Sequence, residues 1–409
     1  MGMRFRVLAG WLVAVWLLCL SGCSSSNSTA SPSTGALFVS TQGDSLVSPF
    51  TIDLSKGTIA TNGKGIAAGP TPSAMIMVPS GNALFIANSN PAITPTIPPS
   101  PCTLPTNLGT VTAYMVQSDG TLMAVSGSST TGYIPLSMAT DSGGHFLFVA
   151  NQGLQCAPAS GTISVFSIQS TTLTEVQGSP FRTAAPLASS GTGPSAVAVT
   201  PDGKFLYVAN QFDATVAQYS VDASGVLTQE STKFVGTAPS ALAITPDGGF
   251  LYVSNAGSSN VSAFAICGKV VTSCADPTSP DGRLSAVSNS PFSAGLGPAF
   301  IVTDSSGKFL FVVDRLSNQV SQYKISTGTG ELTADALAAI STGLNPVWAT
   351  VRNGNTVVKA TGGTTNFLYV ANLGSSSISV YSFDSTVGLL GLVGGPVSTG
   401  GSPAAIAVK

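Results

Sequence analysis

The fold can be predicted from one stretch of the sequence, GPSAVAVTPDGKFLYVANQFDATVAQYSVDASGVL, from Gly193 to Leu227. An apolar run follows Pro194 and ends at a Pro-Asp-Gly turn, a second run ends at Asn210, and a third segment carries Val216 and Tyr219. Short apolar runs separated by Gly, Pro, Asn and Asp are typical of β-strands joined by tight turns. The stretch therefore predicts one antiparallel unit of four short strands.

The same unit recurs along the chain, which predicts a repeat architecture. Seven copies of the second strand begin at Leu37, Leu84, Leu147, Leu206, Leu251, Leu310 and Leu368. Seven prolines open the strand before it, at Pro72, Pro135, Pro194, Pro239, Pro298, Pro346 and Pro403. Proline suits the first residue of a strand, where no hydrogen-bond donor is needed. The proline and the next leucine are 12 residues apart in five units, so the repeat keeps its register.

The two ends of the chain predict that the repeats close into a ring. The chain starts with a leucine strand at Leu37 and ends with a proline strand from Pro403 to Lys409, and neither has its partner beside it in sequence. Seven complete units exist only if the ends join, whereas a linear solenoid needs caps. We predict an all-β, seven-bladed β-propeller of four-stranded blades over residues 35–409, closed by the C-terminal strand. Pro49 falls inside the third strand of the first blade, where we expect a bulge.

The N-terminus predicts export and lipidation. Arg4 and Arg6 precede an apolar run from Val7 to Leu20, which is short for a membrane span but suits a secretory signal. The following Leu-Ser-Gly-Cys23 resembles a bacterial lipobox. We predict a lipoprotein signal peptide at residues 1–22, a flexible tether at 23–34, and an envelope location, anchored to the outer membrane by lipid on Cys23. An ordinary signal peptide or an uncleaved anchor are the alternatives.

Four further cysteines predict two disulfides, which an exported protein can form. Two long insertions follow the second strands of adjacent blades and carry Cys102 and Cys156, so we expect these two to pair. Cys267 and Cys274 lie close together in a later connection, and we expect them to pair as well. A metal site is the alternative, but no CxxC motif or histidine cluster supports it. We expect no metal and no cofactor.

One face of the ring is the expected ligand site, because the loops that follow the second strands gather there. Six second strands end in Asn or Asp. We interpret these mainly as turn residues, which bond to the local backbone and tolerate turn geometry. The alternative is that the Asn side chains form a ring of amides at the channel mouth. Asp314, Arg315 and Asp213 are the charged residues that follow a second strand into this face. A carboxylate near an arginine could polarise an ester. The simpler interpretation is that these three residues belong to turns and are solvated. His145, the single histidine, falls on the opposite face and is a poor catalytic base.

The units PDGKFLYVAN (Pro201 to Asn210), PDGGFLYVSN (Pro246 to Asn255) and SSGKFLFVVD (Ser305 to Asp314) resemble the lactonase family of seven-bladed propellers and the related YVTN surface-protein repeats. The family includes propeller-type 6-phosphogluconolactonases, so the resemblance implies opening of a lactone by water. The family's proposed Arg, Glu and His have no matching His or Glu here, so no catalytic residue is carried over.

Two functions are therefore expected. The first is a lipid-anchored binding or interaction scaffold for a glycan, a protein or the cell wall. The alternative is a hydrolase of an unphosphorylated lactone, with Asp314 and Arg315 as the candidate site. Charged residues make up 8% of the chain and the net charge is −2, which gives no electrostatic basis for nucleic-acid binding. We expect a monomer.

Overall fold

The computed structural model describes residues 34–89, 107–154, 160–183, 192–268, 281–357 and 362–409. The chain divides into Met1–Ser31 and a compact unit, Pro32–Lys409, and only the second is described below. No helix among the described residues is long and apolar enough to cross a membrane.

Pro32–Lys409 forms seven antiparallel sheets, which we call blades 1 to 7 in chain order. Blade 1 contains β32 (Pro403–Val408), β1 (Thr34–Thr41), β2 (Leu46–Asp53), β3 (Ile59–Thr61) and β4 (Ile66–Ala67). Blade 2 contains β5 (Pro72–Met77), β6 (Ala83–Asn88), β7 (Thr110–Val116) and β8 (Leu122–Thr130). Blade 3 contains β9 (Pro135–Thr140), β10 (Phe146–Asn151), β11 (Thr162–Gln169), β12 (Thr172–Glu175) and β13 (Phe181–Arg182).

Blades 4 to 7 repeat this order from the inner to the outer strand. Blade 4 contains β14 (Pro194–Val199), β15 (Phe205–Asn210), β16 (Thr215–Val221) and β17 (Leu227–Phe234). Blade 5 contains β18 (Pro239–Ile244), β19 (Phe250–Asn255), β20 (Asn260–Ile266), β21 (Leu284–Ala286) and β22 (Phe292–Ser293). Blade 6 contains β23 (Pro298–Thr303), β24 (Phe309–Asp314), β25 (Gln319–Ile325) and β26 (Leu332–Ser341). Blade 7 contains β27 (Pro346–Val357), β28 (Thr364–Asn372), β29 (Ser377–Asp384), β30 (Gly391–Leu392) and β31 (Val397–Ser398).

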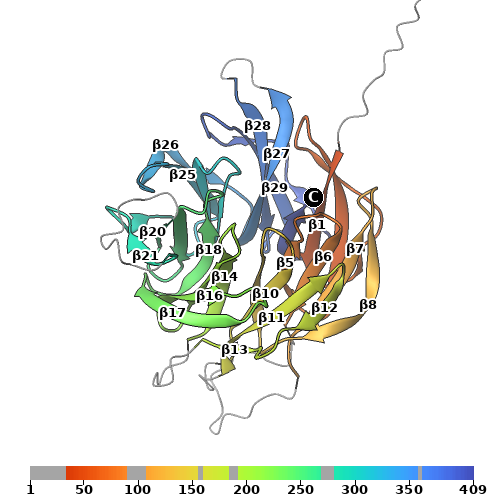
Figure 1. Ribbon diagram of the computed structural model, residues 1–409. Helices are drawn as coiled ribbons and strands as arrows, with labels where there is room; N and C mark the ends of the chain where they lie inside the picture. The colour runs from red at the N-terminus through yellow and green to blue at the C-terminus, as the bar shows by residue number, and fades with distance from the viewer. Residues whose placement is uncertain (1–33, 90–106, 155–159, 184–191, 269–280, 358–361) are drawn as a thin grey trace, which may run out of the picture. The chain divides into compact units, whose positions relative to one another are not determined.

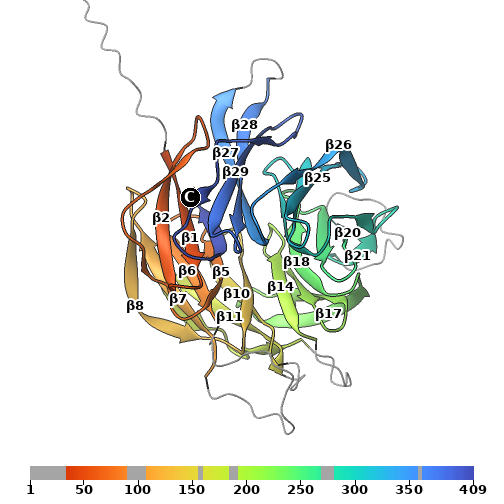
Figure 2. The ribbon, with the colours of Figure 1, turned by 180° about the vertical axis from the view of Figure 1, so that it is seen from behind.

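The predicted ring closure is confirmed. β32 pairs with β1, from Leu37 opposite Val408 to Thr41 opposite Pro403, so the last strand completes the first blade. Figures 1 and 2 show the C-terminus beside β1 from both sides. The Tyr369 hydroxyl of blade 7 also donates to the Gly57 carbonyl of blade 1 at 3.1 Å. The chain ends are therefore joined by a sheet ladder and by a contact between blades.

The core lies between the blades because the second strands are apolar on both faces. The leucine that starts each repeat is fully buried in all seven copies. Strands with a neighbouring layer on each side are expected to be apolar throughout. The outer strands are less regular, since four blades split them into two short pieces.

The bulge expected at Pro49 is absent. β1 and β2 pair without a register shift from Thr34 opposite Asp53 to Thr41 opposite Leu46. Pro49 instead lies between the residues that pair with β3 and those that pair with β4. On its inner side Pro49 pairs with Phe38 of β1, whereas on its outer side neither β3 nor β4 pairs with it.

Candidate functional site: the mouth of the central channel

The inner strands surround a cavity of about 730 Å³ at one end of the channel. Its walls come from the first residues of the inner strands and from residues that directly follow the second strands. Both groups lie on the face that the sequence marks as the ligand face. A cavity of this size suits a small molecule.

Two aromatic rings form an apolar surface inside the cavity. Phe300 of β23 and Trp348 of β27 stack with ring centroids 4.4 Å apart and an interplanar angle of 30°. Trp348 belongs to blade 7, yet it packs against the cores shared by blades 1 and 2 and by blades 2 and 3. The indole therefore reaches across the channel, and with Phe300 it forms what we call the aromatic floor.

Polar side chains lie at the rim, directly after the second strands. Gln42, Gln211 and Arg315 occupy equivalent positions in blades 1, 4 and 6, and all three line the cavity. The Gln152 amide, at the same position in blade 3, donates to the Gln211 side-chain carbonyl at 2.5 Å. Arg315 donates from Nε to the Asn345 side-chain oxygen at 2.6 Å, which holds its guanidinium at the rim. Among the described residues that line the cavity, Arg315 is the only charged one.

Three lining serines tie neighbouring blades together. The hydroxyls of Ser73, Ser195 and Ser240 donate to the carbonyls of the prolines that open the next blades, Pro135, Pro239 and Pro298, at 2.5, 2.6 and 2.7 Å respectively. A buried hydrogen bond of this kind contributes about 1 kcal/mol. These serines therefore support the ring around the channel.

Asp314 and Arg315 do not form the pair that their adjacency suggests. Asp314 is completely buried inside blade 6, and its Oδ2 accepts a hydrogen bond from Ser321 Oγ at 2.5 Å. No salt bridge joins the two within the described parts of the chain. Asp314 is the last residue of β24 and is buried inside the blade, whereas Arg315 begins the turn that follows and lines the cavity. Asp213, in the turn between β15 and β16, is not among the lining residues.

Burial changes the acidity of Asp314. Desolvation raises the pKa of its carboxyl group from 3.8 to about 6, and hydrogen bonds from Ser321, Gln319 and the Gly295 amide offset part of the rise. Its Oδ1 has no hydrogen-bond partner among the described residues. Burial therefore disfavours the ionised form of Asp314, which lies inside the blade and not in the cavity.

The equivalent asparagines are scaffold residues too. Their side-chain amides donate at 3.0 Å to a hydroxyl of the third strand, in the pairs Asn88–Thr112, Asn151–Ser164, Asn255–Ser262 and Asn372–Ser379. These asparagines are at most 1% exposed. The asparagines therefore act as local structural residues at the strand ends and do not form a ring of amides at the channel mouth, because their amides form hydrogen bonds inside the blades.

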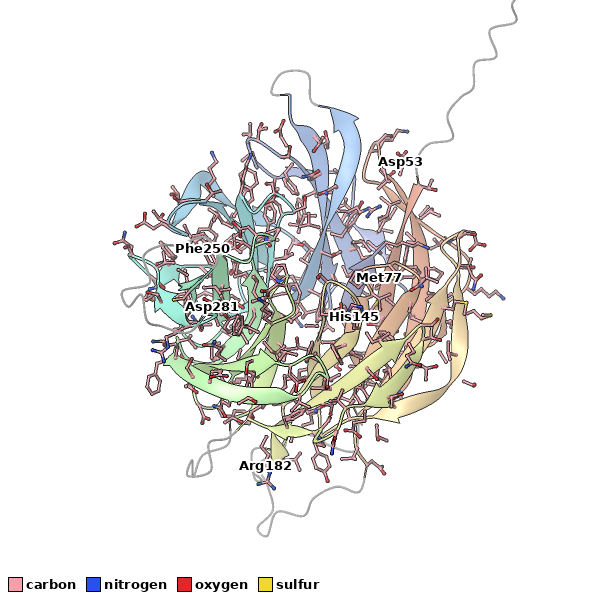
Figure 3. All side chains as sticks on the ribbon, viewed as in Figure 1. Asp53, Met77, His145, Arg182, Phe250 and Asp281 are labelled. Carbon is pink, nitrogen blue, oxygen red and sulfur yellow. The ribbon has the colours of Figure 1, made fainter. Side chains whose placement is uncertain are left out.

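His145 lies on the opposite face, as expected. Its side chain is 74% exposed and its Nδ1 is 2.9 Å from Asp141 Oδ2. It lines a second cavity between blades 3 and 4, away from the mouth. Figure 3 labels His145 and Arg182, a residue of the ligand-face end of blade 3, and they are well separated.

The predicted disulfides fall mainly outside the described residues, as do Cys102, Cys156, Cys274 and the lipidation site Cys23. Cys267 is buried and disulfide-bonded. Its pairing with Cys274 and the Cys102–Cys156 bridge stay predictions. No group of three or more His, Cys, Asp or Glu side chains in the described part of the chain could hold a metal ion.

The sequence contains a signal for the rim that the prediction missed. Aligned on the end of the second strand, the next residue in the seven blades is Gln42, Ser89, Gln152, Gln211, Ala256, Arg315 and Leu373. Reading this column would have found the rim glutamines. The aromatic floor gives no such signal, because its two residues become neighbours only through ring geometry.

A seven-bladed ring with a ligand-sized cavity at the channel mouth defines the class of protein. The family model described as "Lactonase, 7-bladed beta-propeller" matches residues 158–273 and 268–409. The chain therefore belongs to the lactonase family of seven-bladed β-propellers.

Solved structures agree on the fold. The chain is similar to a periplasmic gluconolactonase, PpgL, of Pseudomonas aeruginosa, with 20% identity over 92% of this chain and 99% of that one and a TM-score of 0.70. Candidate 6-phosphogluconolactonases of Bacteroides fragilis and Bacteroides uniformis show 21% and 20% identity, cover 93% and 92% of this chain and 99% of their own, and give TM-scores of 0.69 and 0.67. No curated protein matches the chain.

Proposed function

We propose that this protein is a ligand-binding module of the cell envelope, anchored by lipid on Cys23, that holds a small molecule in the mouth of its propeller channel. The cavity with the aromatic floor and a single arginine at its rim carries this proposal. Aromatic surfaces with a few convergent polar groups are typical of small-molecule sites.

Binding is favoured over hydrolysis because of what lines the cavity. Opening a lactone with water needs a group that accepts a proton from the water. The described lining residues include no carboxylate and no imidazole. Asp314 is buried behind the rim and His145 lies on the opposite face.

Lactone hydrolysis is the second candidate, and the family relationship favours it. One similar structure is called a periplasmic gluconolactonase, which also fits an exported protein. In this alternative, Arg315 would polarise the ester carbonyl and stabilise the negative charge that develops on it. The substrate would be an unphosphorylated lactone, because one arginine offers little charge for a phosphate.

Calorimetry with a filled-cavity variant tests the binding proposal. Residues 24–409 are titrated with glucono-δ-lactone, gluconate, 3-phenylpropionate and a glycan panel, and lactone decay is followed in parallel. Ala299 lines the cavity, so Ala299→Trp should abolish any saturable binding. Ala223→Trp, at an exposed turn position, is the matched control and should bind normally.

The proposal predicts saturable binding without faster lactone decay. Lactone decay accelerated by the wild type and not by Ala299→Trp would establish the hydrolase instead. Binding that survives Ala299→Trp, or no binding to any probe, would overturn the channel mouth as the site.

A further inference from the structure

The polar groups that could contact a ligand are unevenly distributed in the cavity. Arg315, Gln42 and Gln211 lie at the rim, whereas Leu136, Met138, Val197 and Leu242 accompany the aromatic floor on the inner strands. A ligand in this cavity therefore meets hydrogen-bonding side chains mainly at one end.

The serines do not change this distribution. Ser73, Ser195 and Ser240 each give their hydroxyl proton to a proline carbonyl of the next blade. Ser137 accepts a hydrogen bond from the Val197 amide at 3.2 Å. Most of the hydroxyls that line the walls are thus used to hold the blades together.

The rim has free donor capacity. Arg315 donates to Asn345 through Nε only. The two terminal amino groups of its guanidinium form no hydrogen bond with the described residues. Gln211 uses its carbonyl oxygen to accept from Gln152, which leaves its own amide NH₂ as a donor toward the cavity. The two groups lie at separate points of the rim, in blades 6 and 4. The guanidinium fork alone is suited to a planar carboxylate.

We propose that the ligand is an amphipathic carboxylate: a flat apolar body, such as a ring, lies on Trp348 and Phe300, and its carboxylate binds the Arg315 guanidinium at the rim. This inference rests on the proposed function and names the ligand class for the same site. A sugar acid fits less well, because its hydroxyls would face apolar side chains on the floor and walls.

Three probes of similar size test the ligand class by calorimetry on residues 24–409. 3-Phenylpropionate has the apolar ring and the carboxylate, 3-phenylpropan-1-ol has only the ring, and gluconate has the carboxylate on a polyhydroxylated chain. We expect 3-phenylpropionate to bind at least about tenfold more tightly than either of the others, because only it satisfies both ends of the cavity.

Arginine variants test the anchor. Arg315→Gln should weaken 3-phenylpropionate about tenfold or more and leave the alcohol unchanged, because the alcohol has no charge to pair. Arg283→Gln, an exposed arginine at the opposite face, is the matched control and should change neither. Arg315 is exposed, so its loss should not affect folding.

The failures of the two proposals are distinguishable. Gluconate or a neutral lactone binding as tightly as 3-phenylpropionate, and blocked by Ala299→Trp, would overturn the ligand class and keep the binding site. 3-Phenylpropionate binding that is unaffected by Arg315→Gln would overturn the anchor. If none of the probes binds, the channel mouth is not the binding site.

Discussion

Among the individual residues, Asp314 differs most clearly from the residues at the equivalent position of the other blades. Five blades have Asn at the position where blade 6 has Asp. In these blades the Asn side-chain amide donates a hydrogen bond to a hydroxyl of the third strand, as in Asn151–Ser164 and Asn255–Ser262. An ionised carboxylate has no donor, so Ser321 turns its hydroxyl toward Asp314 instead. The departure from the repeat therefore places a buried carboxyl group inside the blade, and it does not create a pair with Arg315.

This contrast predicts a pH-dependent stability. The pKa of folded Asp314 is about 6 against an ordinary 3.8, so protonation favours the folded state. Its contribution is fully present below pH 3.8 and is lost as the pH rises through about 6. Asp314→Asn should therefore raise the free energy of unfolding at pH 8 by about 2 kcal/mol and much less at pH 4.

The converse variant is the control. Asn255→Asp introduces a carboxylate at the equivalent site of blade 5 and should destabilise at pH 8 but little at pH 4. Denaturant midpoints at both pH values measure the effect. An equal change of Asp314→Asn at pH 4 and pH 8 would contradict the role of burial.

At the element scale, the turn between the third and fourth strands joins neighbouring blades. The turn glycine lies against the phenylalanine that directly precedes the repeat's leucine in the second strand of the blade before it, in the pairs Gly57–Phe367, Gly225–Phe146, Gly282–Phe205, Gly330–Phe250 and Gly388–Phe309. At Gly388 the φ is +86° and an added Cβ would lie 2.0 Å from the Phe309 ring. Glycine is required there both by conformation and by space.

Gly388→Ala should therefore lower the free energy of unfolding by about 3 kcal/mol, since it combines an unfavourable φ with a clash. Gly328→Ala, in the corresponding turn of blade 6, meets no atom within 4 Å and should change little. Thermal midpoints compare the two variants. A tolerated Gly388→Ala would show that this turn does not bear on the packing between blades.

At the scale of the whole molecule, the seam between blades 7 and 1 is built like the internal interfaces. Tyr369 donates to Gly57 across the seam at 3.1 Å, and Tyr252 of blade 5 donates to Gly330 of blade 6 at 2.9 Å. Both tyrosines are completely buried. The ring should thus be as tightly closed at the chain ends as elsewhere.

Tyr369→Phe and Tyr252→Phe test this equivalence. Each leaves a carbonyl without its donor and should cost about 1 to 2 kcal/mol in the free energy of unfolding. Comparable losses in denaturant melts support a closed ring. A neutral Tyr369→Phe beside a costly Tyr252→Phe would mean that the seam opens in solution.

The fold can be predicted from the sequence more completely than the candidate site. Leu37 without a proline strand and Pro403 without a leucine strand were sufficient to predict closure, because strand order depends on chain position alone. The rim was predicted only at Arg315, and the glutamines were missed because charge was the criterion. Trp348 and Phe300 could not be paired from sequence, since side-chain direction across a channel depends on the ring's geometry.

Trp348 can report directly whether the ligand lies on the aromatic floor at the channel mouth. It is the only tryptophan after Trp16, so with excitation selective for tryptophan the emission of residues 24–409 comes from this site alone. During titration with 3-phenylpropionate, gluconate or glucono-δ-lactone, we predict a saturable change in Trp348 emission with the same Kd as calorimetry. Saturable heat with unchanged Trp348 emission would show that the ligand binds away from the aromatic floor.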